Sequence, residues 1–154
     1  MSYWLLKTEP SDYSYDELEG EPSGTVWDGV RNYAALKYLR DMVKGDLALV
    51  YHTGKVRAAV GIARVTSDPY PDPESGDERM MVVDVAAERR LARPVPLSGL
   101  RDDPAFSGHP LTRQPRLSVV GLSPEEWDRI LELAGEDPET ARSEREPRRP
   151  LQAR

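Results

Sequence analysis

The apolar residues of this chain fall in short runs that alternate with polar residues, and each run is bounded by residues typical of turns. In GDLALVYHT, residues 45–53, Leu47, Leu49 and Tyr51 would point to one side of a strand and His52 to the other. The order of expected strands and helices is not the alternating pattern of a doubly wound parallel fold. Further strands are expected at residues 3–8, 56–68, 80–86 and 117–120.

Between these strands, three segments carry helix signals. Ser14 and Glu17 have the spacing of a capping box, and residues 123–134 begin with Ser-Pro-Glu-Glu and continue with one apolar face. Residues 32–43 have apolar side chains at helical spacing, with Asn32 as candidate N-cap. Residues 97–102 are expected to form one helical turn. The layout predicts an α+β fold: a curved, mostly antiparallel sheet or partly closed barrel of about five to six strands, with three to four short flanking helices.

The length of 154 residues favours one domain with a real core. Residues 1–135 would form it. The final stretch, residues 136–154, balances acids with arginines and is poor in apolar residues, so we expect a disordered tail. The N-terminus lacks a basic start and a long apolar segment, which argues against a secretory signal, and no run is long enough to span a bilayer. We therefore expect a cytoplasmic protein without a membrane partner.

Composition excludes several kinds of site. The absence of cysteine removes disulfides, thiolate metal ligands and cysteine nucleophiles, and two histidines make a zinc site improbable on composition. We expect no metal and no cofactor. A net charge of −6 argues against a protein that coats nucleic acid by neutralising many phosphates, although one pocket can still have a basic rim. The sequence also lacks phosphate-loop, dinucleotide, nucleophile-elbow and zinc-protease motifs, so no enzyme class is indicated.

The stretch VWDGVRN, residues 26–32, concentrates the side chains that can read a flat polar ligand. Trp27 offers a stacking face, Arg31 a planar fork of donors, and Asn32 both a donor and an acceptor. Gly29 permits a tight turn or a close backbone approach. Each residue also has a purely structural interpretation: Trp27 in the core, Arg31 in a surface ion pair and Asn32 as a helix cap.

Polar side chains also mark two strand ends. The end of the first strand carries Lys7, Thr8 and Glu9, and the end of residues 47–53 carries Tyr51, His52 and Thr53. These residues can line a shared pocket with VWDGVRN, or they can be ordinary core and loop residues. A basic rim is expected from further cations: Lys55, Arg57, Arg113 and Arg116.

Taken together and in order, five stretches resemble the EVE domain family. They are YWLLKTEP at 3–10, the segment from VWDGVRN to VYHT at 26–53, GIARVTSDPYPDP at 61–73, VVDV at 82–85 and LSVVGLSPEEWDRIL at 117–131. The resemblance implies a PUA-like pseudobarrel. It also implies a ligand pocket formed by Lys7, Thr8, Glu9, Trp27, Val30, Arg31, Asn32, Tyr51, His52 and Thr53.

Domains of this type are implicated in recognising modified bases, so the resemblance implies binding of a modified nucleobase in DNA or RNA, with modified cytosine favoured. The base would stack on Trp27 or Tyr51, and Arg31, Asn32 or Thr53 would bind its edge. Two other functions compete with this one. The protein could be an enzyme acting on a nucleotide-like small molecule with His52 as acid or base, or it could be a protein-interaction module whose core at Trp27 leaves no cavity.

Overall fold

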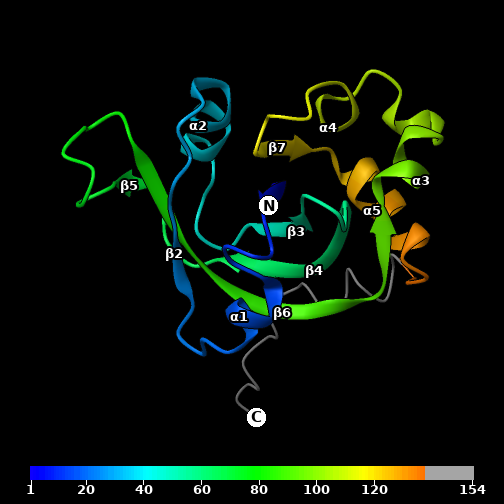
Figure 1. The fold of residues 1–154 in the computed structure, drawn as a ribbon, viewed down its shortest axis with the longest axis horizontal. Helices are drawn as coiled ribbons and strands as arrows, with labels where there is room; N and C mark the ends of the chain where they lie inside the picture. Colours follow the sequence, from blue (N-terminus) through cyan, green and yellow to red (C-terminus); the bar gives the residue numbers. More distant parts are fainter. Residues whose placement is uncertain (138–154) are drawn as a thin grey trace, which may run out of the picture.

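The computed structural model of the chain describes residues 1–137 and contains one curled sheet with short helices around it (Figure 1). Its strands are β1 (Tyr3–Thr8), β2 (Thr25–Trp27), β3 (Leu47–His52), β4 (Ala58–Val65), β5 (Tyr70–Pro71), β6 (Met81–Pro96) and β7 (Val119–Leu122). They are arranged in the order β2-β6-β4-β3-β1-β7, with β5 paired to β6. Every pair is antiparallel except β1 with β3. The predicted α+β, mostly antiparallel barrel-like fold is confirmed.

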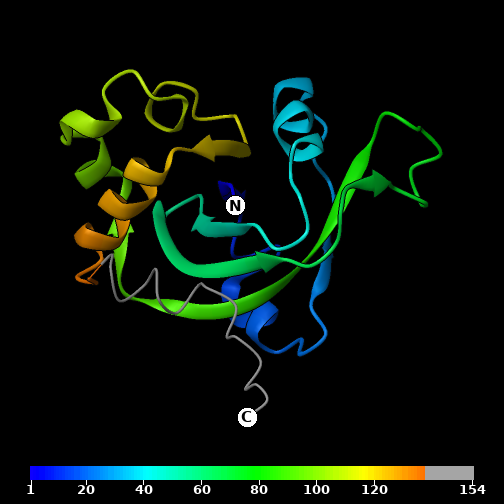
Figure 2. The ribbon, with the colours of Figure 1, turned by 180° about the vertical axis from the view of Figure 1, so that it is seen from behind.

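The helices are α1 (Tyr15–Glu19), α2 (Tyr33–Arg40), α3 (Leu97–Arg101), α4 (Pro110–Arg113) and α5 (Pro124–Leu133), with a 3₁₀ turn, η1, at Pro104–Phe106. In Figures 1 and 2, α3, α4 and α5 lie together on one side of the molecule, α2 lies on the other side, and α1 lies below β6. The predicted capping box at Ser14 with Glu17 is present, and the predicted helix start at Ser123 also forms a capping box, with Glu126. The helix α2 packs against both β6 and β7.

Several predicted boundaries differ from the structure. The strand expected over residues 56–68 runs only from Ala58 to Val65. The helix predicted over residues 32–43 ends at Arg40, because Met42 and Val43 belong to a turn in which the Val43 N–H donates to Asp46 Oδ2 at 2.9 Å. Val43, expected on the apolar face, is 56% exposed. The strand predicted at 80–86 continues to Pro96, since Leu91 and Val95 are buried while the three residues between them are exposed. The strand predicted at 117–120 begins two residues later, at Val119.

The sheet separates two apolar clusters, and alternate residues of one strand belong to different clusters. Leu6 and Val50 lie in the cluster that contains Trp27 and the buried face of α2. Leu5 and Tyr51 lie in the other cluster, which is covered by α3, α4, α5 and η1. Side chains on neighbouring positions of a strand therefore face different surroundings.

Register shifts and one glycine account for the curl of the sheet. The β3–β4 and β4–β6 pairings both change register, and such bulges bend a strand. At Gly61, the Tyr15 ring lies directly on the backbone: an added Cβ would be 2.4 Å from Tyr15 Cζ. The Tyr15 hydroxyl donates to Ile62 O at 2.7 Å, so α1 is fixed to β4.

Glu136, at the start of the expected tail, binds the sheet. Its carboxylate accepts from the Ala92 N–H at 2.8 Å and pairs with Arg89 at 2.7 Å. Burial alone would raise the pKa of Glu136, but these two partners lower it below its usual value. Residues 138–154 lie outside the described part of the chain, and the predicted disorder and domain boundary stay predictions. None of the helices between residues 1 and 137 has the length and apolar character needed to cross a bilayer.

Candidate functional site

Two of the three predicted stretches meet at one edge of the sheet. The parallel register of β1 and β3 places Lys7 opposite Tyr51 and Thr8 opposite His52. The pairing continues past the strands, because the Thr53 N–H donates to Thr8 O at 2.9 Å. Alternation then divides the side chains between the two faces of the sheet.

Thr8 and Glu9 shape the turn that follows β1. The Thr8 hydroxyl donates to Tyr13 O at 2.7 Å, and Glu9 O accepts the N–H groups of Asp12 and Tyr13, both at 2.9 Å. The Glu9 carboxylate accepts the Ser11 hydroxyl at 3.0 Å. These contacts fix the positions of Asp12 and Tyr13, two residues that were not among the predicted ligands.

His52 supports the same region from β3. Its Nε2 accepts the Tyr15 N–H, the first N–H of α1, at 3.0 Å. An accepting Nε2 has no proton, so the ring is neutral in this contact. Burial lowers the pKa of His52, opposed by the charge of Glu9. The lone pair that a general base would use is therefore engaged in holding α1, and the geometry does not favour the enzyme alternative built on His52.

Trp27 forms one wall of a cavity of about 370 Å³. It is 7% exposed and packs against the cluster on its side of the sheet, yet its ring meets Tyr13 edge-on, with centroids 6.2 Å apart and planes at 85°. The two rings form a corner. The cavity is lined by Asp12, Tyr13, Thr25, Val26, Trp27 and Asp28. The interaction-module alternative predicts no cavity beside Trp27, so this cavity argues against that alternative.

The residues after Trp27 have separate roles. Val30 is buried, whereas Arg31 and Asn32 are exposed. Asn32 is the N-cap of α2, with Oδ1 accepting the Ala35 N–H at 3.1 Å. Its amide NH₂ has no partner in residues 1–137, and no carboxylate there pairs with the Arg31 guanidinium. Asn32 can therefore cap the helix with its oxygen and still offer its NH₂ to a ligand.

Lys7 and Tyr51 lie on the opposite face of the sheet from Trp27. Lys7 Nζ is 5.6 Å from the centre of the Tyr51 ring and donates to Pro115 O at 3.3 Å. Together with Thr53 and Arg57 they line a second cavity, of about 210 Å³, which Arg101 completes. Of the predicted basic rim, Arg57 lines this cavity; Lys55, Arg113 and Arg116 are exposed but are not among its lining residues.

Comparison with known proteins identifies the family of the chain. The model of the EVE domain matches residues 2–133. The chain belongs to the EVE domain family. It is 35% identical to mouse thymocyte nuclear protein 1 over 171 residues, covering 89% of this chain and 75% of that protein. The name describes a nuclear protein, and the cytoplasmic location expected here stays a prediction.

Two solved EVE-like structures share the fold. An NMR structure from Rhodopseudomonas palustris has a TM-score of 0.83 and 34% identity, covering 88% of this chain and 94% of that one. Human THYN1 protein in complex with DNA containing 5-methylcytosine has a TM-score of 0.79 and 29% identity, covering 89% and 99%. The family resemblance drawn from the sequence is thus confirmed.

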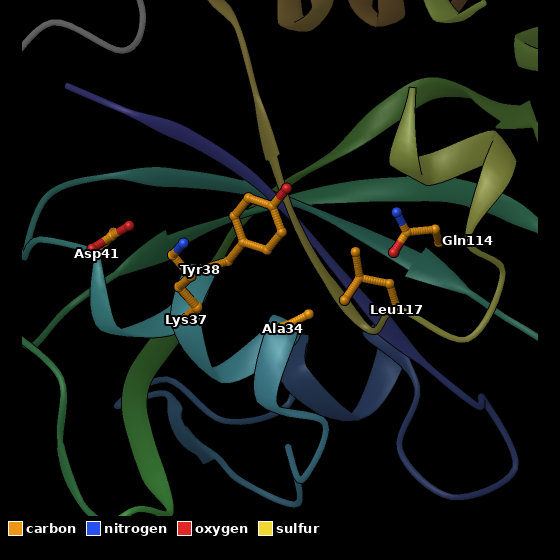
Figure 3. A pocket seen from close by; sticks show the side chains of 6 residues that line it. All are labelled: Ala34, Lys37, Tyr38, Asp41, Gln114 and Leu117. Carbon is orange, nitrogen blue, oxygen red and sulfur yellow. The ribbon is translucent and has the colours of Figure 1, made fainter. Parts of the chain in front are cut away.

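A third cavity of this EVE domain, of about 260 Å³, was not predicted at all (Figure 3). Ala34, Lys37, Tyr38 and Asp41 border it from α2, and Gln114 and Leu117 border it from the segment before β7. The residues that line the other two cavities but were not among the predicted ligands include Asp12, Tyr13, Asp28 and Arg101. One feature of the sequence could have indicated Tyr13. It directly precedes the capping box at Ser14, so the start of α1 places it near the end of β1.

Proposed function

We propose that this EVE domain binds a modified nucleobase of DNA or RNA, modified cytosine favoured, in the cavity between Trp27 and Tyr13. The observation that carries the proposal is the corner formed by these two rings beside an open cavity. A base in the corner stacks on one ring and meets the other edge-on, two arrangements that aromatic pairs favour. The complex of the human relative with 5-methylcytosine DNA supports the same ligand class.

The polar lining of the cavity supports cytosine. Asp12 and Asp28 line it, and neither carboxylate has a hydrogen-bond or ion-pair partner within residues 1–137. Carboxylates accept hydrogen bonds from the exocyclic amino group of cytosine. A 5-methyl group adds apolar surface beside this amino group, on the same edge of the ring, and Val26 gives the cavity an apolar lining residue. A base must leave its stack to enter such a pocket, so the ligand is single-stranded or flipped.

Five of the other predicted ligands fall into two groups in this proposal; Val30 is buried, and Lys7, Tyr51 and Thr53 line a different cavity. Thr8, Glu9 and His52 are positioning residues, since they hold the turn and the helix on either side of Tyr13. Arg31 and the amide of Asn32 are exposed beyond Trp27 and serve the edge of the base or its backbone.

The test is titration of short single-stranded oligonucleotides that differ only at one central cytosine, 5-methylcytosine or N6-methyladenine. Tyr13→Ala removes one wall and should weaken binding about 5- to 150-fold, the equivalent of a stacking energy of about 1–3 kcal/mol. Trp27→Phe keeps the core filled and tests the other wall. Tyr33→Ala is the matched control, because Tyr33 is 60% exposed and does not line this cavity. Wild-type affinity of both cavity variants for every oligonucleotide would refute the assignment.

A further inference from the structure

The cavity on the far side of the sheet from Trp27 has an unusual set of charges. Three cations line it, from three different segments: Lys7 from β1, Arg57 from the β3–β4 turn and Arg101 from the end of α3. No carboxylate is among its lining residues. The Glu9 carboxylate lies against Gly54 in this turn but does not line the cavity. In a chain of net charge −6, a cavity bordered by three cations does not follow from composition.

Lys7 is the half-buried member of this set. Its ammonium has a carbonyl at 3.3 Å and the face of Tyr51 at 5.6 Å, and no carboxylate within residues 1–137 pairs with it. Burial lowers the pKa of Lys7, which reflects the cost of removing its charge from water. Buried charges are normally paired, and a bound anion would supply the missing partner.

Arg57 is held in a conformation that residues with side chains seldom adopt. Its φ is 48°, the only positive φ of a residue other than glycine among residues 1–137. The turn fixes it through Arg57 Nε, which donates to Gly54 O at 3.1 Å, and through Arg57 O, which accepts the Leu97 N–H at 2.8 Å. Such strain is concentrated at ligand clamps and active sites. The terminal guanidinium nitrogens remain without a partner in the described residues.

Tyr51 contributes a hydroxyl to the same cavity. The residue is 3% exposed, and its hydroxyl has no hydrogen-bond partner within residues 1–137. Burial raises the pKa of Tyr51, while the charges of Arg57 and Arg101 lower it, so both guanidinium groups act on the phenol. Thr53 adds a second hydroxyl to the wall, whereas the Thr112 hydroxyl donates to the carbonyls of Phe106 and His109, both at 3.0 Å.

We propose that this cavity is a phosphate-binding site, separate from the base cavity at Trp27. Three cations that approach from different segments suit a tetrahedral anion with several acceptor oxygens, and arginine forks bind phosphate through paired hydrogen bonds. The hydroxyls of Tyr51 and Thr53 donate to the remaining oxygens. The phosphate belongs either to a polynucleotide backbone or to a free phosphate or mononucleotide. The site stands independently of base recognition.

The test compares Arg101→Gln with Arg116→Gln. Both remove one exposed arginine charge, but only Arg101 lines the cavity. Three probes are titrated at constant ionic strength: inorganic phosphate, cytidine 5′-monophosphate, and an unmodified single-stranded oligonucleotide. Arg101→Gln should weaken at least one probe tenfold or more, and Arg116→Gln should not. With the oligonucleotide, the slope of log affinity against log salt should also fall by about 0.7, the loss of one phosphate contact.

The three probes identify the source of the phosphate. Weakened binding of inorganic phosphate or the mononucleotide indicates a free phosphate ligand, and an effect confined to the oligonucleotide indicates the backbone. Tyr13→Ala should leave phosphate binding unchanged, which separates this proposal from that of base recognition. If Arg101→Gln weakens none of the probes more than Arg116→Gln does, the cavity is not a phosphate site.

Discussion

The contact between Gly61 and Tyr15 gives a prediction whose sign changes with background. In wild type, the methyl group of Gly61→Ala would lie 2.4–2.7 Å from three atoms of the Tyr15 ring. Tyr15 is fully buried, so its ring can move only by displacing α1 or by breaking the 2.7 Å bond to Ile62 O. The overpacking costs about 1–3 kcal/mol and the lost hydrogen bond about 0.5–1.5 kcal/mol.

A smaller favourable effect opposes these costs. Replacing glycine by alanine inside a strand stabilises it by about 0.5–1 kcal/mol, because glycine loses more backbone freedom on folding. We expect Gly61→Ala to lower the free energy of unfolding by about 1–3 kcal/mol net in wild type. In a Tyr15→Ala background the ring is gone, and the same substitution should be neutral or stabilising.

Urea denaturation of the four proteins of this double-mutant cycle measures the coupling directly. The Tyr15→Ala protein will be less stable, and the cycle needs only that it still unfold cooperatively. If Gly61→Ala has the same cost in both backgrounds, the close packing of Tyr15 on Gly61 is not what fixes α1. Because Tyr13 precedes α1, Gly61→Ala should also weaken oligonucleotide binding in wild type.

Three further predictions concern His52, Asn32 and Asp46. Burial lowers the pKa of His52 in the folded state below its ordinary value of 6.5, so the unfolded state binds more protons as the pH falls. Stability is therefore lost on acidification. His52→Gln should reduce that loss in urea titrations between pH 7.5 and 5. Asn32→Ala should cost about 0.5–2 kcal/mol in thermal or urea unfolding, whereas Asn32→Asp keeps the helix cap. If Asn32→Asp is fully stable but binds the base more weakly, the Asn32 amide also contacts the ligand. Asp46→Asn should cost about 1–3 kcal/mol by urea denaturation, because the buried carboxylate accepts from Trp4 Nε1 and the Val43 N–H, both at 2.9 Å; an unchanged midpoint would contradict this.

Local signals were sufficient for most of the fold. Both capping boxes and the cap at Asn32 depend on residues within four positions of each other, so they could be predicted from the sequence. The end of α2 could not be predicted in this way. It depends on Asp46, whose carboxylate also accepts hydrogen bonds from Ser2 and Trp4, 44 and 42 positions earlier in the sequence. The length of β6 likewise depends on pairing with β2, β4 and β5, which periodicity does not specify.

The candidate site was predicted less completely, for a related reason. Alternation along residues 47–53 already places Tyr51 and His52 on opposite sides. Which of them shares a face with Trp27 is decided by β2, which pairs with β6 far from β3 in strand order. Trp27 and Tyr51 line different cavities. The backbones of β1 and β3 do lie side by side as expected, but their side chains do not all face the pocket at Trp27.

This division explains why adjacent residues of two strand ends have such different chemistry. Thr8 and His52 face the side of Trp27, where they hold Tyr13 and α1 through neutral hydrogen bonds, and no cation lines that cavity. Lys7 and Tyr51 face the other side, where cations gather without a carboxylate in the lining. A neutral base and a charged phosphate need opposite environments, and under the two proposals one strand pair would serve both because its side chains alternate. Substitutions at neighbouring positions 7 and 8 should therefore affect phosphate binding and base binding separately.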